Sequence, residues 1–171
     1  HLERAHGIRW VALRYFNAAG ADPDGELGEH HAPEIHIIPR AIEAATGGPG
    51  LQVFGNDYPT PDGTCLRDYI HVSDLAEAHI AALDHLLADG HSAAFNVGTG
   101  KGQTVMEVLL AVEEVTGKHV PYRVVGRREG DPAELVADSS ALRAALMWKP
   151  RRSGIHEIIR DAWAYFQLRS K

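Results

Sequence analysis

Residues 53–75 read VFGNDYPTPDGTCLRDYIHVSDL, and the rest of the chain is arranged around this stretch. It opens with a β-branched and aromatic run ending at Gly55, which is typical of a short strand. A segment rich in turn residues follows, and the run RDYIHV then leads to a helix start at Ser73. Polar loops between apolar anchors commonly hold binding groups. Arg67 is the strongest candidate, because a guanidinium binds phosphate through two hydrogen bonds, although an Arg-Asp pair is more often a surface ion pair.

The composition is that of one ordinary globular domain. Hydrophobic residues make up 44% and charged residues 23% of the 171 positions, which is enough to bury a core. The net charge of −6 argues against a nucleic-acid partner. The single cysteine, Cys65, cannot form an internal disulfide, which favours a cytoplasmic location. No apolar run approaches the roughly 18 residues of a membrane span, and no signal peptide opens the chain, so no membrane partner is expected.

Strands and helices are expected to alternate along the chain, which indicates an α/β fold with parallel pairing. Apolar runs predict strands over residues 8–16, 51–54, 93–97 and 120–126, the first buried and broken by residues 17–20. Helical spacing and end signals predict helices over residues 37–46, 73–90, 104–117, 140–148 and 155–168. Ser73 is expected to cap the second of these helices. Its buried face is expected to contain Leu75, Ala78, Ala82, Leu83 and Leu86.

Two tempting motifs are not expected to bind ligands. Histidines and carboxylates gather at Glu29, His30, His31, Glu34 and His36, but their spacing fits no standard zinc motif, and adjacent His30 and His31 cannot easily face one ion. The glycine-rich residues 98–102 follow a strand and precede a helix, yet they match neither a Walker loop nor a dinucleotide turn. The sequence therefore predicts no metal ligands, and a tight turn rather than a phosphate loop.

The strings YPTPDGT (58–64) and RDYIHV (67–72) lie in one uninterrupted segment. This segment resembles that of UDP-glucose 4-epimerases, extended members of the short-chain dehydrogenase/reductase family. LRYFNAAGAD at 13–22 is a further match, and the resemblance covers roughly residues 7–166. Related dehydratases have a much shorter loop here, so the match favours an epimerase. The resemblance implies the C-terminal part of an NAD-binding Rossmann-type epimerase, with its last parallel strands and helices, plus the small substrate-binding domain.

The same resemblance implies a division of the chain. Residues 1–18 and 64–117 would complete the nucleotide-binding sheet and its helices, and residues 19–63 and 118–171 would form the UDP-sugar-binding domain. The chain has no initiator methionine, and residues 1–7 read like the end of a helix. We therefore expect it to be the C-terminal half of a longer enzyme.

The resemblance also implies which residues bind the UDP-sugar. Arg67 and Arg128 match the two arginines on the UDP diphosphate, and Asp131 matches a carboxylate that takes a ribose hydroxyl. Uridine contacts are implied for Gln52, Val53 and Phe54.

At the sugar end, Asn17 would hydrogen-bond the substrate, and His36 and Ile37 would lead into the helix beside the sugar and diphosphate. Tyr15 would pack near the nicotinamide and is the one cofactor-binding residue. Leu135 falls where side-chain bulk decides whether an N-acetylated sugar fits, so the choice between UDP-glucose and UDP-N-acetylglucosamine stays open.

The catalytic residues of the family are absent from the sequence. Its reaction needs a Gly-x-x-Gly-x-x-Gly turn for NAD and a Tyr-x-x-x-Lys pair. No such glycine spacing occurs, and the residues four places after the tyrosines are Ala19, Asp62, Ser73, Gly126 and Arg169. The family reaction belongs to galactose metabolism: NAD oxidises C4 of UDP-glucose or UDP-galactose, the 4-keto sugar rotates, and it is re-reduced. We expect the chain alone to be an inactive part of such an isomerase, with the main NAD site elsewhere.

Two alternatives stay open at this stage. One is a non-catalytic UDP-sugar-binding or interaction module, and the other is a related sugar-nucleotide epimerase or dehydratase. In either case residues 8–16 and 93–97 would lack sheet neighbours and expose apolar faces and strand edges. Self-association, or contact with a missing N-terminal half, is therefore expected.

Overall fold

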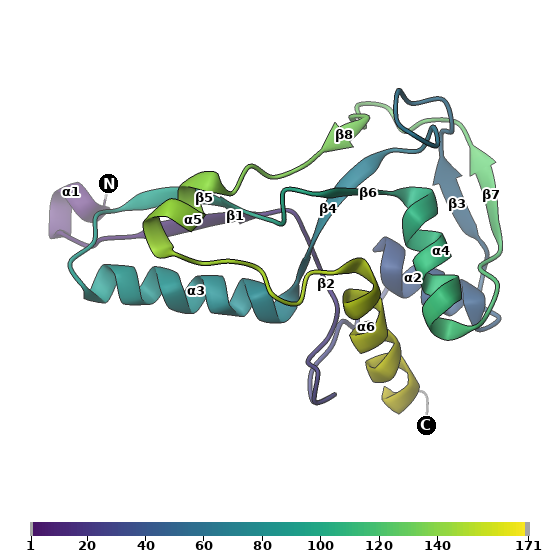
Figure 1. Cartoon of the computed structure of the whole chain (residues 1–171), viewed down its shortest axis with the longest axis horizontal. Coiled ribbons are helices and arrows are strands. Elements are labelled where there is room, and N and C mark those ends of the chain that lie inside the picture. The colour runs from purple at the N-terminus through teal and green to yellow at the C-terminus, as the bar shows by residue number, and fades with distance from the viewer. Residues whose placement is uncertain (1, 170–171) are drawn as a thin grey trace.

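The computed structural model describes residues 2–169, in which two groups of helices and strands are joined by a central sheet (Figure 1). The short helix α1 (Leu2–His6) opens the chain at one end of the molecule. Strand pairing is parallel except where one short strand joins the central sheet, so the α/β class indicated by the alternation is confirmed. Among the helices described, none is both long and apolar enough to cross a membrane.

The first group is built on two parallel strands, β1 (Val11–Tyr15) and β5 (Ala93–Val97). Helices α3 (Val72–Leu87) and α5 (Ser140–Leu146) pack against them. Figure 1 shows α3 running alongside β1 over most of its length. The hydrophobic core of this group includes Ile70, Leu75, Ala78, Phe95, Val97, Leu142 and Trp148.

The second group contains another parallel pair, β3 (Leu51–Phe54) with β7 (Tyr122–Val125), and three helices that pack against one another. The helices are α2 (Ile37–Ala45), α4 (Val105–Thr116) and α6 (Ile155–Arg169). Their apolar faces meet in a core that includes Ile38, Ile42, Val108, Val112, Ile158 and Ile159. The division of the chain into two domains at the boundaries given above stays a prediction.

Strand β4 (Leu66–His71) is the centre of the sheet that joins the groups. It pairs in parallel with β2 (Asn17–Ala19) and β8 (Glu134–Leu135), and antiparallel with β6 (Gly102–Thr104). Because β4 follows the turn-rich loop and leads directly into α3, residues 53–75 connect both groups.

A buried carboxylate fastens this junction. Asp68 has no exposed surface, and it accepts hydrogen bonds from the N–H and hydroxyl of Thr99 and from the N–H groups of Gly100 and Ala137. A Cβ on Gly98 would come within 2.6 Å of this carboxylate, so only glycine fits there. The turn at residues 98–102 thus surrounds a carboxylate of the chain itself, which agrees with the tight-turn interpretation.

The first strand differs from the prediction. The regular strand spans only Val11–Tyr15, and Tyr15 and Trp10 are about half exposed, so the interpretation of residues 8–16 as one buried strand was wrong. Residues 17–19, expected to be a break, form β2, because their backbone groups pair with β4. The chain therefore moves from one sheet to another between Tyr15 and Asn17.

Helix α3 differs in its cap and in its buried face. The cap is His71 rather than Ser73, since the Nδ1 of His71 accepts the N–H of Ser73 while its Nε2 faces Asp161 at 3.1 Å. Leu83 was expected to face the core, but it is 55% exposed. It lies with Ile80 and Leu87 on an outer apolar face of α3, at spacings of three and four residues.

Candidate ligand-binding site

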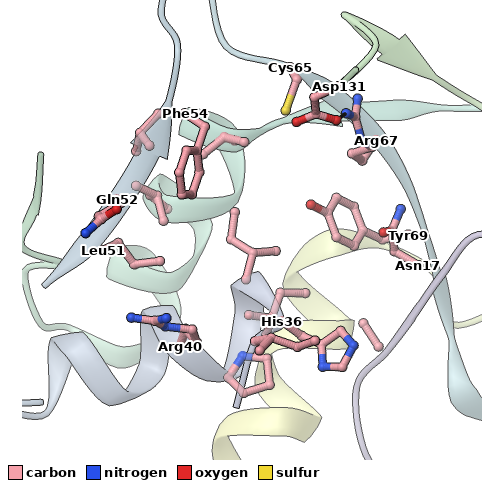
Figure 2. A pocket seen from close by; sticks show the side chains of 18 of the residues that line it. Asn17, His36, Arg40, Leu51, Gln52, Phe54, Cys65, Arg67, Tyr69 and Asp131 are labelled. Carbon is pink, nitrogen blue, oxygen red and sulfur yellow. Dashed lines mark hydrogen bonds and ion pairs between the residues drawn. The ribbon is translucent and has the colours of Figure 1, made fainter. Parts of the chain in front are cut away.

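A cavity of about 390 Å³ lies between the central sheet and the second group (Figure 2). Its volume is in the usual range of small-molecule sites, roughly 300–1,000 Å³. The walls come from β2, Glu29 in the loop that follows it, α2 and the residues just before it, β3, β4 and Cys65, α4, and the segment after β7. The side chains discussed below are Asn17, Glu29, His36, Ile37, Arg40, Gln52, Val53, Phe54, Cys65, Arg67, Tyr69, Arg128 and Asp131.

Strand β4 and the residue before it present every second side chain to the cavity, as the two-residue period of a strand requires. These side chains are Cys65, Arg67 and Tyr69. Burial raises the pKa of the Cys65 thiol, Arg67 lowers it and Asp131 raises it, and the net result is a pKa above the ordinary value. Burial likewise raises the pKa of the Tyr69 phenol far above its usual range. Tyr69 therefore stays a hydrogen-bond donor, and its hydroxyl points toward the middle of the cavity in Figure 2.

Two guanidinium groups approach the cavity near its β3 and β4 walls. Arg67 donates to its own strand at the carbonyl of Leu66 (2.7 Å) and pairs with the carboxylate of Asp131. Its side chain is only 13% exposed, so the pair has a fixed geometry. The guanidinium of Arg128 lies 3.9 Å from the centre of the Phe54 ring, in a cation–π contact.

The neighbouring Arg127 belongs to a different surface. Its Nε donates to Asp57 at 2.7 Å, and its guanidinium lies 4.1 Å from the centre of the Tyr58 ring. Arg127 does not line the cavity. Of these two adjacent arginines, only Arg128 lines the cavity.

The opposite end of the cavity is formed by α2 and β2. His36, the residue just before α2, lies four positions before Arg40, and both line the cavity together with Ile37. Asn17 donates its amide N–H to the carbonyl oxygen of Asp68 at 2.7 Å, which leaves its amide oxygen as an acceptor.

A group of histidines and carboxylates lies where this end meets solvent. His36 Nδ1 is 2.9 Å from Glu34 Oε1 and also pairs with Glu29 Oε1, which lies 3.3 Å from His31 Nε2. Burial raises the pKa of Glu29, His36 lowers it and Glu34 raises it, leaving it above the ordinary value. His30 is exposed and is not part of the group. The sequence argument against a metal was that adjacent His30 and His31 cannot easily face one ion. That argument does not apply to Glu29, His31 and His36, which meet here without His30.

The structure brings together all but two of the residues implied by the resemblance. Leu135 pairs with Arg67 in the register of β8 and β4, but it is 45% exposed and does not line the cavity. Tyr15 lies at the end of β1, edge-on to His79 with ring centres 6.2 Å apart, and is also outside the cavity. Their roles toward the sugar and the cofactor stay predictions.

Sequence reasoning missed Tyr69 and Arg40. The signal for Tyr69 was present, because it lies two residues after Arg67 in a strand and must share its face. Arg40 likewise follows His36 by four residues in a helix. Both were overlooked because the resemblance assigned them no role.

Comparison with known proteins gives close relatives. UDP-glucose 4-epimerase from Rhizobium leguminosarum bv. trifolii is 55% identical over 157 residues, which are 91% of this chain and 48% of that protein. The crystal structure of the Brucella ovis UDP-glucose 4-epimerase in complex with NAD matches with a TM-score of 0.93 and 50% identity, over 96% of this chain and 51% of that one. The Bifidobacterium longum enzyme in complex with NAD+ and UDP matches with a TM-score of 0.90 and 38% identity, over 99% and 51%.

The chain spans about half the length of the curated relatives it matches. A family model described as the NAD dependent epimerase/dehydratase family matches residues 1–98, which is more than half of the 171 positions. Together with the shared fold, this match shows that the chain belongs to the NAD dependent epimerase/dehydratase family.

Proposed function

We propose that this chain holds the nucleotide diphosphate of the substrate in a UDP-glucose 4-epimerase. The observation that carries the proposal is the convergence of residues from distant parts of the sequence on one cavity. Arg67, Arg128, Asp131, Phe54 and Asn17 lie in different elements or loops, yet all line the same space. Relatives at 45–55% identity are named UDP-glucose 4-epimerase, and a structural neighbour was crystallised with UDP.

The arginines are suited to the diphosphate. A guanidinium carries five N–H groups, and Arg67 commits two of its groups to Leu66 and Asp131, so others remain for phosphate oxygens. Arg128 is held over Phe54 by a contact that leaves the edges of its guanidinium plane free to donate. Two cations on two phosphates would provide most of the affinity.

The residues on one side of the arginines are suited to the nucleoside, and those on the other side to the sugar. We propose that Gln52, Val53 and Phe54 contact the uridine and that Asp131 takes a ribose hydroxyl while remaining paired with Arg67. On the other side, the free amide oxygen of Asn17 would accept from a sugar hydroxyl, with His36 and Ile37 in the wall.

We expect the main cofactor site to lie outside this chain, with Tyr15 as its one contact to the nicotinamide. In the glycine turn at residues 98–102, the N–H groups of Thr99 and Gly100 donate to the carboxylate of Asp68. They are therefore not free to bind the diphosphate of a dinucleotide, and the turn does not fit one. NAD, when bound to a whole epimerase, supplies hydride transfer at C4 of the sugar. Since the sequence has no Tyr-x-x-x-Lys pair, we expect no epimerase turnover from the 171-residue chain, and we propose a cytoplasmic location on the basis of its lone cysteine.

The adjacent arginines give a sharp test by calorimetric titration of the chain with UDP. Arg128→Ala should weaken UDP binding about 10- to 100-fold, as expected for loss of a charge-assisted hydrogen bond. Arg127→Ala is the matched control and should bind UDP like the parent chain, because Arg127 faces Asp57 and Tyr58. Equal losses in the two variants, or no saturable binding by a folded parent chain, would contradict the proposal.

A further inference from the structure

Three potential metal ligands meet at the edge of the cavity. Glu29, His31 and His36 each offer one donor atom, and these atoms all lie within 4.8 Å of one another. His31 Nε2 is 3.3 Å from Glu29 Oε1, and His36 Nδ1 approaches the same oxygen. The two imidazole rings have their centres 5.1 Å apart and are inclined at 53°, so they converge rather than stack.

Glu29 is the less satisfied of the two carboxylates that face His36. Glu34 Oε1 accepts the N–H groups of Ile35 and His36 at 2.8 Å, whereas Glu29 Oε1 faces only imidazole rings among the described residues. Oxygens of both Glu29 and Glu34 lie against the single nitrogen Nδ1, which carries at most one hydrogen. The side chains of Glu29 and Glu34 are only 19% and 8% exposed, so water compensates them poorly. The positive end of α2 opposes a cation here, but two carboxylates outweigh its partial charge. A divalent cation would balance the negative charge of the carboxylates, and both imidazoles could coordinate it.

We propose that Glu29, His31 and His36 bind a divalent transition-metal ion such as Zn²⁺. Imidazole with carboxylate is a ligand set that suits zinc and its neighbours, and three protein ligands leave one position for water. Donors of a tetrahedral zinc site lie about 3.3 Å apart, which is the separation of His31 and Glu29. His36 Nδ1 and Glu29 Oε1 lie closer together than this, so the half-exposed ring of His36 must turn away from Glu29 to admit the ion.

Such an ion would fix part of the cavity wall. Glu29 and His36 both line the cavity, whereas His31 lies outside it, so the metal would tie residues 29–31 to the start of α2 from the solvent side. The ion would position these residues and would lie at the end of the cavity away from Arg67. The metal site shares His36 with the proposed substrate cavity, but Co²⁺ binding is measured without nucleotide, so its test does not depend on the nucleotide proposal.

Titration of the metal-free chain with CoCl₂, followed by displacement with ZnCl₂, tests the site directly. The parent chain should bind one Co²⁺ with the visible absorption of a four-coordinate ion and lose it to Zn²⁺. His31→Gln and His36→Gln should each weaken Co²⁺ binding about tenfold or more. His30→Gln is the matched control, because His30 is the exposed neighbour of His31 and is not in the cluster, and it should bind like the parent chain.

Circular dichroism of the three variants should be unchanged, because His30, His31 and His36 are all exposed. No saturable Co²⁺ site in the parent chain, or equal weakening by His30→Gln and His31→Gln, would overturn the assignment. An octahedral Co²⁺ spectrum insensitive to His36→Gln would do the same. UDP titration of His31→Gln keeps the two proposals distinguishable, because His31 lies outside the cavity and its loss should leave UDP binding unchanged.

Discussion

Cys65 shows how one residue takes its chemistry from its surroundings. It is 9% exposed, lines the cavity beside Arg67 and Asp131, and is the only cysteine of the chain. Burial is the largest influence on its thiol and raises the pKa, which leaves less thiolate at neutral pH. Its location in the cavity is therefore not a sign of a nucleophile.

We predict that iodoacetamide modifies Cys65 slowly at neutral pH. The rate should be at least about tenfold lower than in the chain unfolded by urea, because both the raised pKa and burial reduce attack. It should increase with pH up to and above the ordinary thiol pKa. Mass spectrometry can follow the single adduct. Labelling as fast in the folded as in the unfolded chain would contradict the burial of Cys65 in the cavity wall.

At the scale of elements, the turn-rich loop is fastened to the start of α4. Thr104 forms a capping box with Glu107, as its position before a helical run indicates. Asp62 joins this cap, since its carboxylate accepts from the hydroxyl of Thr104 and from the N–H and hydroxyl of Thr64. The loop between β3 and β4 therefore keeps its position relative to the helix that packs behind the cavity.

This contact predicts a pH-dependent stability. Burial alone would raise the pKa of Asp62, but the hydrogen bonds from Thr104 and Thr64 outweigh it and hold the pKa below its ordinary value of 3.8. A carboxylate with a lowered folded-state pKa stabilises the fold above the unfolded-state pKa, and the contribution disappears as pH falls through the folded-state pKa. Urea unfolding should show Asp62→Asn to be less stable than the parent chain at about pH 7.

The difference between Asp62→Asn and the parent chain should shrink below about pH 4. It should be modest at neutral pH, because Asp62 is exposed to solvent. Asp84→Asn, an exposed aspartate of α3, is a suitable control and should follow the parent chain at every pH. A constant difference from about pH 7 to pH 3 would exclude the ionised form of Asp62 as the source.

For the whole molecule, the exposed apolar surface of the first group is the main liability. Ile80, Leu83 and Leu87 are 55–74% exposed on one face of α3, and β1 has only β5 as a neighbour in the described part of the chain. Both features favour association, the helix through apolar area and the strand through unpaired backbone groups.

We predict that the purified chain self-associates, as light scattering would show by a mass above that of one chain at micromolar concentration. Leu83→Lys combined with Leu87→Lys should reduce the associated fraction, because it removes most of the apolar face without touching the core. Leu110→Lys, at a single exposed leucine of α4, should have little effect. A parent chain that remains a monodisperse monomer would contradict the prediction.

The sequence by itself determined the features that depend on near neighbours. Strands over 51–54 and 93–97 and a helix over 104–117 were predicted because period, capping and turn chemistry involve residues a few places apart. The motif around Arg67 determined the family for a related reason, since an uninterrupted string of residues is itself a local feature.

Only the tertiary structure decided what depends on residues far apart. Whether Leu83 is covered depends on which elements pack on α3, and residues 17–19 become a strand only because β4 lies beside them. The spacing of residues in a sequence cannot predict such contacts. They depend on how distant segments pack, and the conformation of each residue alone does not determine that packing.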